Sequence, residues 1–151
     1  MSPTAFALLV LWCSVLTTCD LRQRRLPNVL TASGALIIFG YALFTTQFTA
    51  AVVGSVWLAT PYLLVHLIAP ATLGAGDVKL AVGLGAVAAL GGAQVWVRAA
   101  LLAPILTATF GLAVLAHWRI RSGADRAGPH ALPHGPAMCL ATVLSLAAAY
   151  G

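Results

Sequence analysis

The sequence predicts an all-α, polytopic membrane protein, a single-domain bundle of about six transmembrane helices over residues 1–151. Composition is the first reason: 61% of the residues are hydrophobic and only 7% are charged, whereas about a quarter of the residues of a soluble domain are charged. Continuity is the second reason. The apolar residues form unbroken runs, as in membrane helices, whereas the strands of a membrane barrel alternate apolar and polar residues.

Six apolar segments can be drawn, each close to the roughly 20 residues that a helix needs to cross the hydrocarbon core. They are Ser2–Cys19, Val29–Thr46, Thr49–Ile68, Val78–Val95, Val97–Trp118 and Ala131–Tyr150. Two of them contain a proline, Pro61 or Pro104. Membrane helices tolerate such prolines when neighbouring groups satisfy the freed backbone.

The basic residues alternate between the gaps that separate these segments. The first gap holds Arg22, Arg24 and Arg25, the third Lys79, the fourth Arg98, and the fifth Arg119, Arg121 and Arg126. Seven of the eight therefore lie on one side, which the positive-inside rule places in the cytoplasm, with both termini outside. The net charge of +5 thus reflects orientation in a lipid bilayer. Because no basic stripe or arm is present, we expect no nucleic-acid partner.

The fourth segment is rich in glycine and alanine. Ala81, Gly85 and Ala89 are spaced four residues apart, so they line one helix face and allow a neighbouring backbone to approach closely. We interpret this face as a packing surface. It predicts that the helix after Asp77 is buried within the bundle.

The chain contains three acidic residues, and two of them are candidates for chemistry. Asp125 lies in a basic, polar loop, where we expect it to be solvated. Asp20 and Asp77 each lie where an apolar segment meets a cytoplasmic gap, and an acid beside an apolar segment indicates function. Two carboxyls held about 3 Å apart share one proton. The ionised partner can then activate water while the neutral one donates to a peptide carbonyl.

The surroundings of the two acids favour different roles. Asp77 is expected to begin the fourth helix, where the positive end of the dipole favours an anion, whereas Asp20 follows the end of the first helix. We therefore assign Asp77 as the base and Asp20 as the acid. Gly74 and Gly76 are expected to give the backbone conformations that other residues resist. Lys79 either anchors the topology or stabilises the ionised carboxylate of Asp77.

Three motifs carry a family resemblance. Asp20 is followed seven residues later by Pro27-Asn28, and Gly74–Leu80 reads Gly-Ala-Gly-Asp-Val-Lys-Leu. The stretch Leu132–Pro136 contains a Pro-His-Gly-Pro element. With these motifs in this order, the sequence resembles the type IV prepilin peptidases, which are membrane aspartic proteases of the GxGD group. His134 stands where phenylalanine is usual in that family.

The resemblance implies an aspartic endopeptidase of the bacterial cytoplasmic (inner) membrane that cleaves the leader from prepilin-like precursors at the cytoplasmic face. The scissile bond would follow a glycine that ends a short basic leader and would precede an apolar helix. The family motifs make Asp20 and Asp77 catalytic and assign site-shaping or substrate-binding positions to Pro27, Asn28, Gly74, Gly76 and Lys79. No cofactor and no metal are implied.

The cysteines mark a departure from the larger family members, which begin with a zinc-binding region of paired CxxC motifs. Cys13, Cys19 and Cys139 form no CxxC, so we expect no zinc and interpret these thiols as buried, apolar side chains. That region accompanies N-methylation, so its absence puts methylation in doubt. The chain resembles the short, peptidase-only forms of tight-adherence pilus systems.

Two alternatives from other functional classes compete with this interpretation. A small proton-coupled transporter would also use paired acids, although nearer the bilayer midplane. A non-catalytic scaffold for pilus assembly would need no acid pair. His66, inside the third segment, is expected to pack and to bond a backbone carbonyl.

Overall fold

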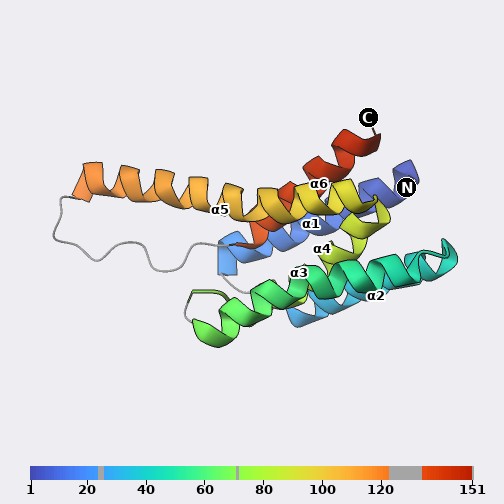
Figure 1. Cartoon of the computed structure of the whole chain (residues 1–151). Coiled ribbons are helices and arrows are strands. Elements are labelled where there is room, and N and C mark those ends of the chain that lie inside the picture. The colour runs from blue at the N-terminus through green and yellow to red at the C-terminus, as the bar shows by residue number, and fades with distance from the viewer. Residues whose placement is uncertain (24–25, 71, 123–133, 151) are drawn as a thin grey trace.

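The structure is a computed structural model that describes residues 1–23, 26–70, 72–122 and 134–150, without the side chains of residues 118–122. These residues form six helices, as Figure 1 shows, and the predicted all-α fold is confirmed. The helices are α1 (Pro3–Gln23), α2 (Asn28–Phe44), α3 (Phe48–Ile68), α4 (Ala75–Leu90), α5 (Ala93–Ser122) and α6 (Gly135–Tyr150). Pro3–Gln23, Phe48–Ile68 and Ala93–His117 are long and apolar enough to cross a membrane.

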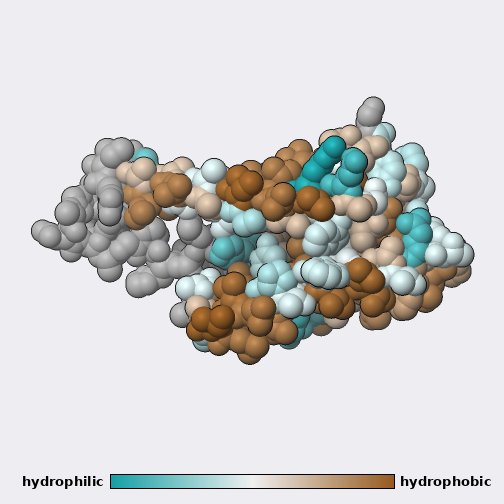
Figure 2. Space-filling view, in the orientation of Figure 1, coloured by the Kyte–Doolittle hydropathy of each residue, from teal (hydrophilic) through white to brown (hydrophobic). Residues whose placement is uncertain are grey.

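The outer surface of the bundle is apolar, as expected of a protein surrounded by lipid. Large hydrophobic side chains on several helices are well exposed, including Leu36, Phe44, Trp57, Leu67 and Ile68. Figure 2 shows the corresponding hydrophobic ridges along the visible face. A water-soluble protein rarely exposes apolar patches of this extent.

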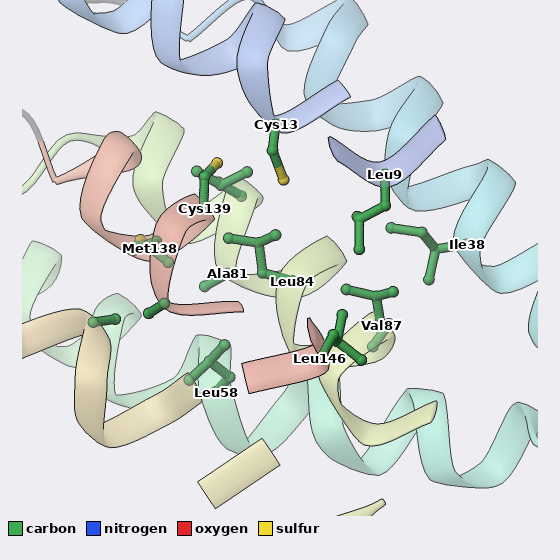
Figure 3. Packing of buried hydrophobic residues seen from close by; sticks show 14 of the residues in the cluster. Leu9, Cys13, Ile38, Leu58, Ala81, Leu84, Val87, Met138, Cys139 and Leu146 are labelled. Carbon is green, nitrogen blue, oxygen red and sulfur yellow. The ribbon is translucent and has the colours of Figure 1, made fainter. Parts of the chain in front are cut away.

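Helix α4 is the centre of the bundle and packs against α2, α3, α5 and α6. Most of its residues are buried, including Leu80, Leu84 and Val87. Figure 3 shows Leu84 and Val87 within a cluster that receives side chains from the surrounding helices. The predicted burial of the helix that follows Asp77 is therefore confirmed.

The closest packing joins α3 to α4. A Cβ atom added at Gly85 would lie 2.5 Å from the carbonyl oxygen of Gly54, so only glycine fits there. Ser55 Oγ donates to Val82 O at 2.8 Å, and Trp96 Nε1 donates to Gly54 O at 3.0 Å. Small residues thus let the backbones of α3 and α4 meet, as predicted for the glycine- and alanine-rich face, and side chains of α3 and α5 donate to the carbonyl groups at this contact.

Several helix boundaries differ from the hydropathy pattern. Helix α5 begins at Ala93, four residues before the predicted Val97, and ends at Ser122, four residues after the predicted Trp118. Helix α1 continues through Gln23, so Asp20 lies in its last turn and does not follow the helix. Helix α4 ends at Leu90, five residues before the predicted Val95, and Gly92 adopts a positive φ of 100°. Hydropathy does not detect this stop because glycine in the left-handed conformation ends a helix without making the segment polar. Residues 131–133 of the sixth predicted segment lie outside the described residues.

The cysteines lie largely as expected. Cys13 and Cys139 are buried, and Cys19 is half-buried. Figure 3 shows Cys13 of α1 and Cys139 of α6 facing each other inside the core.

Candidate active site

Asp20 reaches the site from the last turn of α1. Its side chain is only 6% exposed, and its Oδ2 atom is buried without a hydrogen-bond partner among the described residues. A Cβ atom added at Gly135, the first residue of α6, would lie 2.7 Å from this oxygen. Pro136 follows in the first helical turn, where proline is tolerated because its missing N–H would have no intrahelical partner. The start of α6 thus places bare backbone against the Asp20 carboxyl.

Asp77 reaches the site from the first turn of α4 and is 9% exposed. It precedes the predicted fourth apolar segment, Val78–Val95, and lies outside the three long spans. Burial, and then the negative charge of Asp20, raise the pKa of Asp77 to about 6, while the backbone of Gly74 opposes the rise. The N-terminal end of a helix favours an anion. Asp77 is therefore held at the edge of ionisation near neutral pH.

The structure brings the two predicted acids into one site. The C-terminal end of α1 and the N-terminal ends of α4 and α6 lie toward the same end of the bundle (Figure 1). Asp20 and Asp77 are near enough for the charge of one to act on the other, but no hydrogen bond joins their carboxyls in the described part of the chain. They form an electrostatically coupled pair.

Two further polar side chains border the acids. His134, immediately before α6, lies near Asp20: burial lowers the pKa of His134, and the negative charge of Asp20 opposes this shift. Tyr62 of α3 is half-buried and close enough to Asp77 to respond to its charge. The sequence signalled neither as a site residue. Tyr62 stands in an apolar segment, and His134 stood out only as a departure from the family pattern.

Lys79 and Asn28 connect the two sequence motifs directly. Lys79 Nζ donates a hydrogen bond to Asn28 Oδ1 at 2.8 Å on the exposed surface. Lys79 is two residues after Asp77, so the two side chains point to different sides of α4. Pro27, in an extended conformation, is the N-cap residue of α2, and its carbonyl oxygen accepts a hydrogen bond from the Thr31 amide. The first motif is thereby fastened to the helix that carries Asp77.

Gly74 and Gly76 differ from expectation. Gly74 has φ −72° and ψ 148°, which any residue can adopt. Positive φ values occur only at Thr46 and Gly92 among the described residues, so the predicted special conformation is wrong. The constraint on Gly76 is space: a Cβ atom there would lie 3.1 Å from Leu26 Cβ. Gly76 thus lets the segment before Pro27 approach the start of α4.

His66 has the structural role predicted for it. Its Nδ1 atom lies 2.8 Å from the carbonyl oxygen of Leu73. Because a carbonyl only accepts, Nδ1 carries the proton in this contact. The hydrogen bond ties α3 to the residue before Gly74. In the described ranges, no group of three or more His, Cys, Asp or Glu side chains is arranged to hold a metal ion.

Comparison with protein families decides the relationship. The model of the type IV leader peptidase family matches residues 7–116, which include both acids and their motifs. The chain belongs to the type IV leader peptidase family. The resemblance seen in the sequence is therefore confirmed. No curated protein and no solved structure matches the chain.

Membership of the leader peptidase family identifies the chain as a membrane protein related to proteases. Gly135 and His134, which border Asp20, lie beyond the matched residues. Leader peptidase chemistry is the hydrolysis of a peptide bond, which requires the activation of a water molecule.

Proposed function

We propose that this leader peptidase is an aspartic endopeptidase that cleaves type IV prepilin-like precursors, with Asp20 and Asp77 as its catalytic pair. The observation that supports this most strongly is the convergence of two buried acids, 57 positions apart in the sequence, at one end of the bundle. Burying a charge without a partner is costly. Two acids that are buried close together therefore indicate a functional role.

The two acids divide the work through their surroundings. Asp77, at the N-terminal end of α4, is the ionised partner and takes a proton from water. The water oxygen then attacks the scissile carbonyl. Asp20, whose Oδ2 atom is buried without a hydrogen-bond partner among the described residues, donates to the carbonyl oxygen the one proton that the coupled pair retains. The pair titrates jointly, so its apparent pKa values belong to both residues.

The remaining motif residues shape the site. The Lys79–Asn28 hydrogen bond and the close approach of Gly76 to Leu26 hold the first motif beside α4. Pro27 starts α2 at this point, and Gly74 lies against the Asp77 carboxyl. We propose that all of these belong to a single peptidase domain spanning residues 1–151.

The distribution of charge supports an orientation in the bacterial inner membrane. The gaps between apolar segments that the sequence pattern assigns to the side of Asp20 and Asp77 hold seven of the eight basic residues, which favours the cytoplasmic side. The site would then cleave at the cytoplasmic face, where a precursor's leader leaves the membrane.

A cleavage assay tests the proposal. The purified full chain, in detergent, is mixed with a precursor that has a short basic leader ending in glycine and an apolar helix of about 20 residues. Mass spectrometry should show one cut after the glycine in the wild type. Cleavage should be lost in Asp20→Asn and in Asp77→Asn and kept in Asp125→Asn, the matched control. Cleavage by both dyad variants would refute the pair, and the absence of cleavage by the wild type would favour a transporter or a scaffold.

A further inference from the structure

A cavity of about 560 Å³ opens between α3 and α5. Both helices pack against α4 but not closely against each other, so they form two separated walls. We call this space the α3–α5 groove. Its lining residues are Trp57, Leu58, Pro61, Tyr62, Val65, Thr72, Leu73, Trp96, Ala100, Pro104, Thr107, Ala108 and His134.

The lining differs from the rest of the lipid-facing surface. Figure 2 shows a paler band between the hydrophobic ridges of α3 and α5. Aromatic, proline and threonine side chains contribute to the lining, and aromatic residues are enriched at protein interfaces. Ala100 and Ala108 have small side chains, which allow a second helix to approach the α5 side of the groove closely.

One end of the groove reaches the acids. His134 and Leu73 both line it. Each directly precedes a glycine that lies against one of the two carboxyls, Gly135 against Asp20 and Gly74 against Asp77. From Trp96 to Ala108 the α5 wall extends for about 18 Å, at 1.5 Å per residue. This length accommodates about three turns of a helix whose end lies beside the catalytic pair.

We infer that the α3–α5 groove receives the apolar helix of the precursor from the lipid and places the bond before that helix beside Asp20 and Asp77. The inference rests on the proposed peptidase function and adds the route and docking surface of the substrate. An apolar occupant is required because the walls carry mostly apolar atoms. A protein helix fits better than lipid chains because aromatic and small side chains form the lining and the groove is continuous with the site.

A second cavity provides a contrast. It has a volume of about 540 Å³ and is lined by α1, α5 and α6, with Leu21, Phe110 and Leu140 among its residues. Although it is similar in size, neither Tyr62 nor His134 lines it. It is therefore the matched control site.

Photo-crosslinking tests the docking surface without cleavage. A benzoylphenylalanine is placed at Ala100 or Ala108 in the full-length Asp77→Asn variant, and at Leu140 or Leu36 as controls. The probe is the precursor with a basic leader and an apolar helix, after the unlabelled wild type has been shown to cleave it. Crosslinks at Ala100 and Ala108 that exceed those at the controls are expected. Crosslinks mainly at Leu140 or Leu36 would overturn the docking site and leave the peptidase function intact.

Kinetics provide a second readout. Ala108→Trp narrows the groove and should raise KM for the precursor about tenfold, equivalent to about 1.4 kcal/mol. A short soluble peptide across the cleavage site, without the apolar helix, should be cut by the same variant at the wild-type rate. Ala113→Trp, on an exposed position of α5 outside the groove, should leave both substrates unaffected. An unchanged KM in Ala108→Trp would also contradict the inference, whereas failure of the wild type to cleave would count against the peptidase function.

Discussion

The two acids occupy differently built halves of the site. Asp77 belongs to α4, whose backbone is pressed against α3 at Gly85 and is joined to it through Ser55. Asp20 belongs to the last turn of α1, and its carboxyl lies against the single bare residue Gly135 of α6. The fold therefore places Asp77 on a helix pressed against α3, and it places Asp20 at a helix end whose carboxyl lies against the start of α6. Changes on the α4 side should mainly affect stability, and changes on the α6 side should mainly affect activity.

The largest effect is expected from filling the α3–α4 interface. Gly85→Leu would place a side chain where a Cβ atom already overlaps Gly54, and overpacking typically costs about 1–3 kcal/mol and occasionally more. We expect the free energy of unfolding to fall by about 3 kcal/mol, measured by denaturant unfolding in detergent. Gly40→Leu is the control, because a Cβ atom there meets nothing within 4 Å. Equal free energies of unfolding for the two variants would show that close packing between α3 and α4 does not stabilise the fold.

The Asp77→Asn substitution should increase the free energy of unfolding and should abolish cleavage. Folding raises the pKa of Asp77 to about 6 from its usual value of about 4, so the folded protein binds this proton more tightly than the unfolded chain. Wild-type stability should therefore fall as pH rises from about 4 to about 6, by up to about 3 kcal/mol. The free energy of unfolding of the Asn variant should not fall in this way. The variant should therefore match the wild type in stability at pH 4 and exceed it by the full amount above pH 6. Thermal unfolding of both proteins across this range measures it, and an advantage independent of pH would contradict the assignment.

Gly135→Ala probes the other half. The methyl group added by this substitution would displace the Asp20 carboxyl. Because only the end of a side chain has to move, the bundle should stay folded. We expect a fall in kcat of about tenfold, which corresponds to about 1.4 kcal/mol, with a stability change below about 1 kcal/mol. In Gly74→Ala, the new methyl would lie 3.6 Å from Asp77 Oδ2, which is an ordinary contact. The fall in kcat should therefore be smaller than in Gly135→Ala. A larger loss in Gly74→Ala would reverse the comparison.

The smallest effect is expected at the link between the motifs. The Lys79–Asn28 hydrogen bond is exposed, and such bonds contribute about 1 kcal/mol or less. A double-mutant cycle with Lys79→Met and Asn28→Ala should give a coupling of about 0.5–1 kcal/mol in the free energy of unfolding. Additive effects of the two changes would mean that the pair does not hold α2 to α4.

Much of the fold could be predicted because membrane helices are selected by simple physical demands. Continuous apolar runs placed the helices, and the distribution of basic residues placed Asp20 and Asp77 on one side. The small-residue face of α4 predicted close packing, which Gly85 and Gly54 display. Boundaries were less predictable, because the last turn of α1 is polar and Gly92 stops α4 by conformation.

Only the site residues that belong to sequence motifs could be predicted. The two acids were found from their positions beside apolar runs. The contact of Gly135 with Asp20 and the electrostatic influence of Asp77 on Tyr62 depend on which helix faces meet, and no local sequence pattern predicts that. The explanation for the glycines before Asp77 was wrong for a related reason: Gly76 is needed for the approach of Leu26, a partner distant in sequence.

The central claim is that Asp20 and Asp77 act as one unit. The most direct measurement compares cleavage of the same precursor by Asp20→Asn, Asp77→Asn and the double variant under single-turnover conditions. Residues that act as a unit are non-additive, so each single variant should lose as much activity as the double variant. A substantial fraction of the wild-type rate in either single variant, with a further drop in the double variant, would contradict the account.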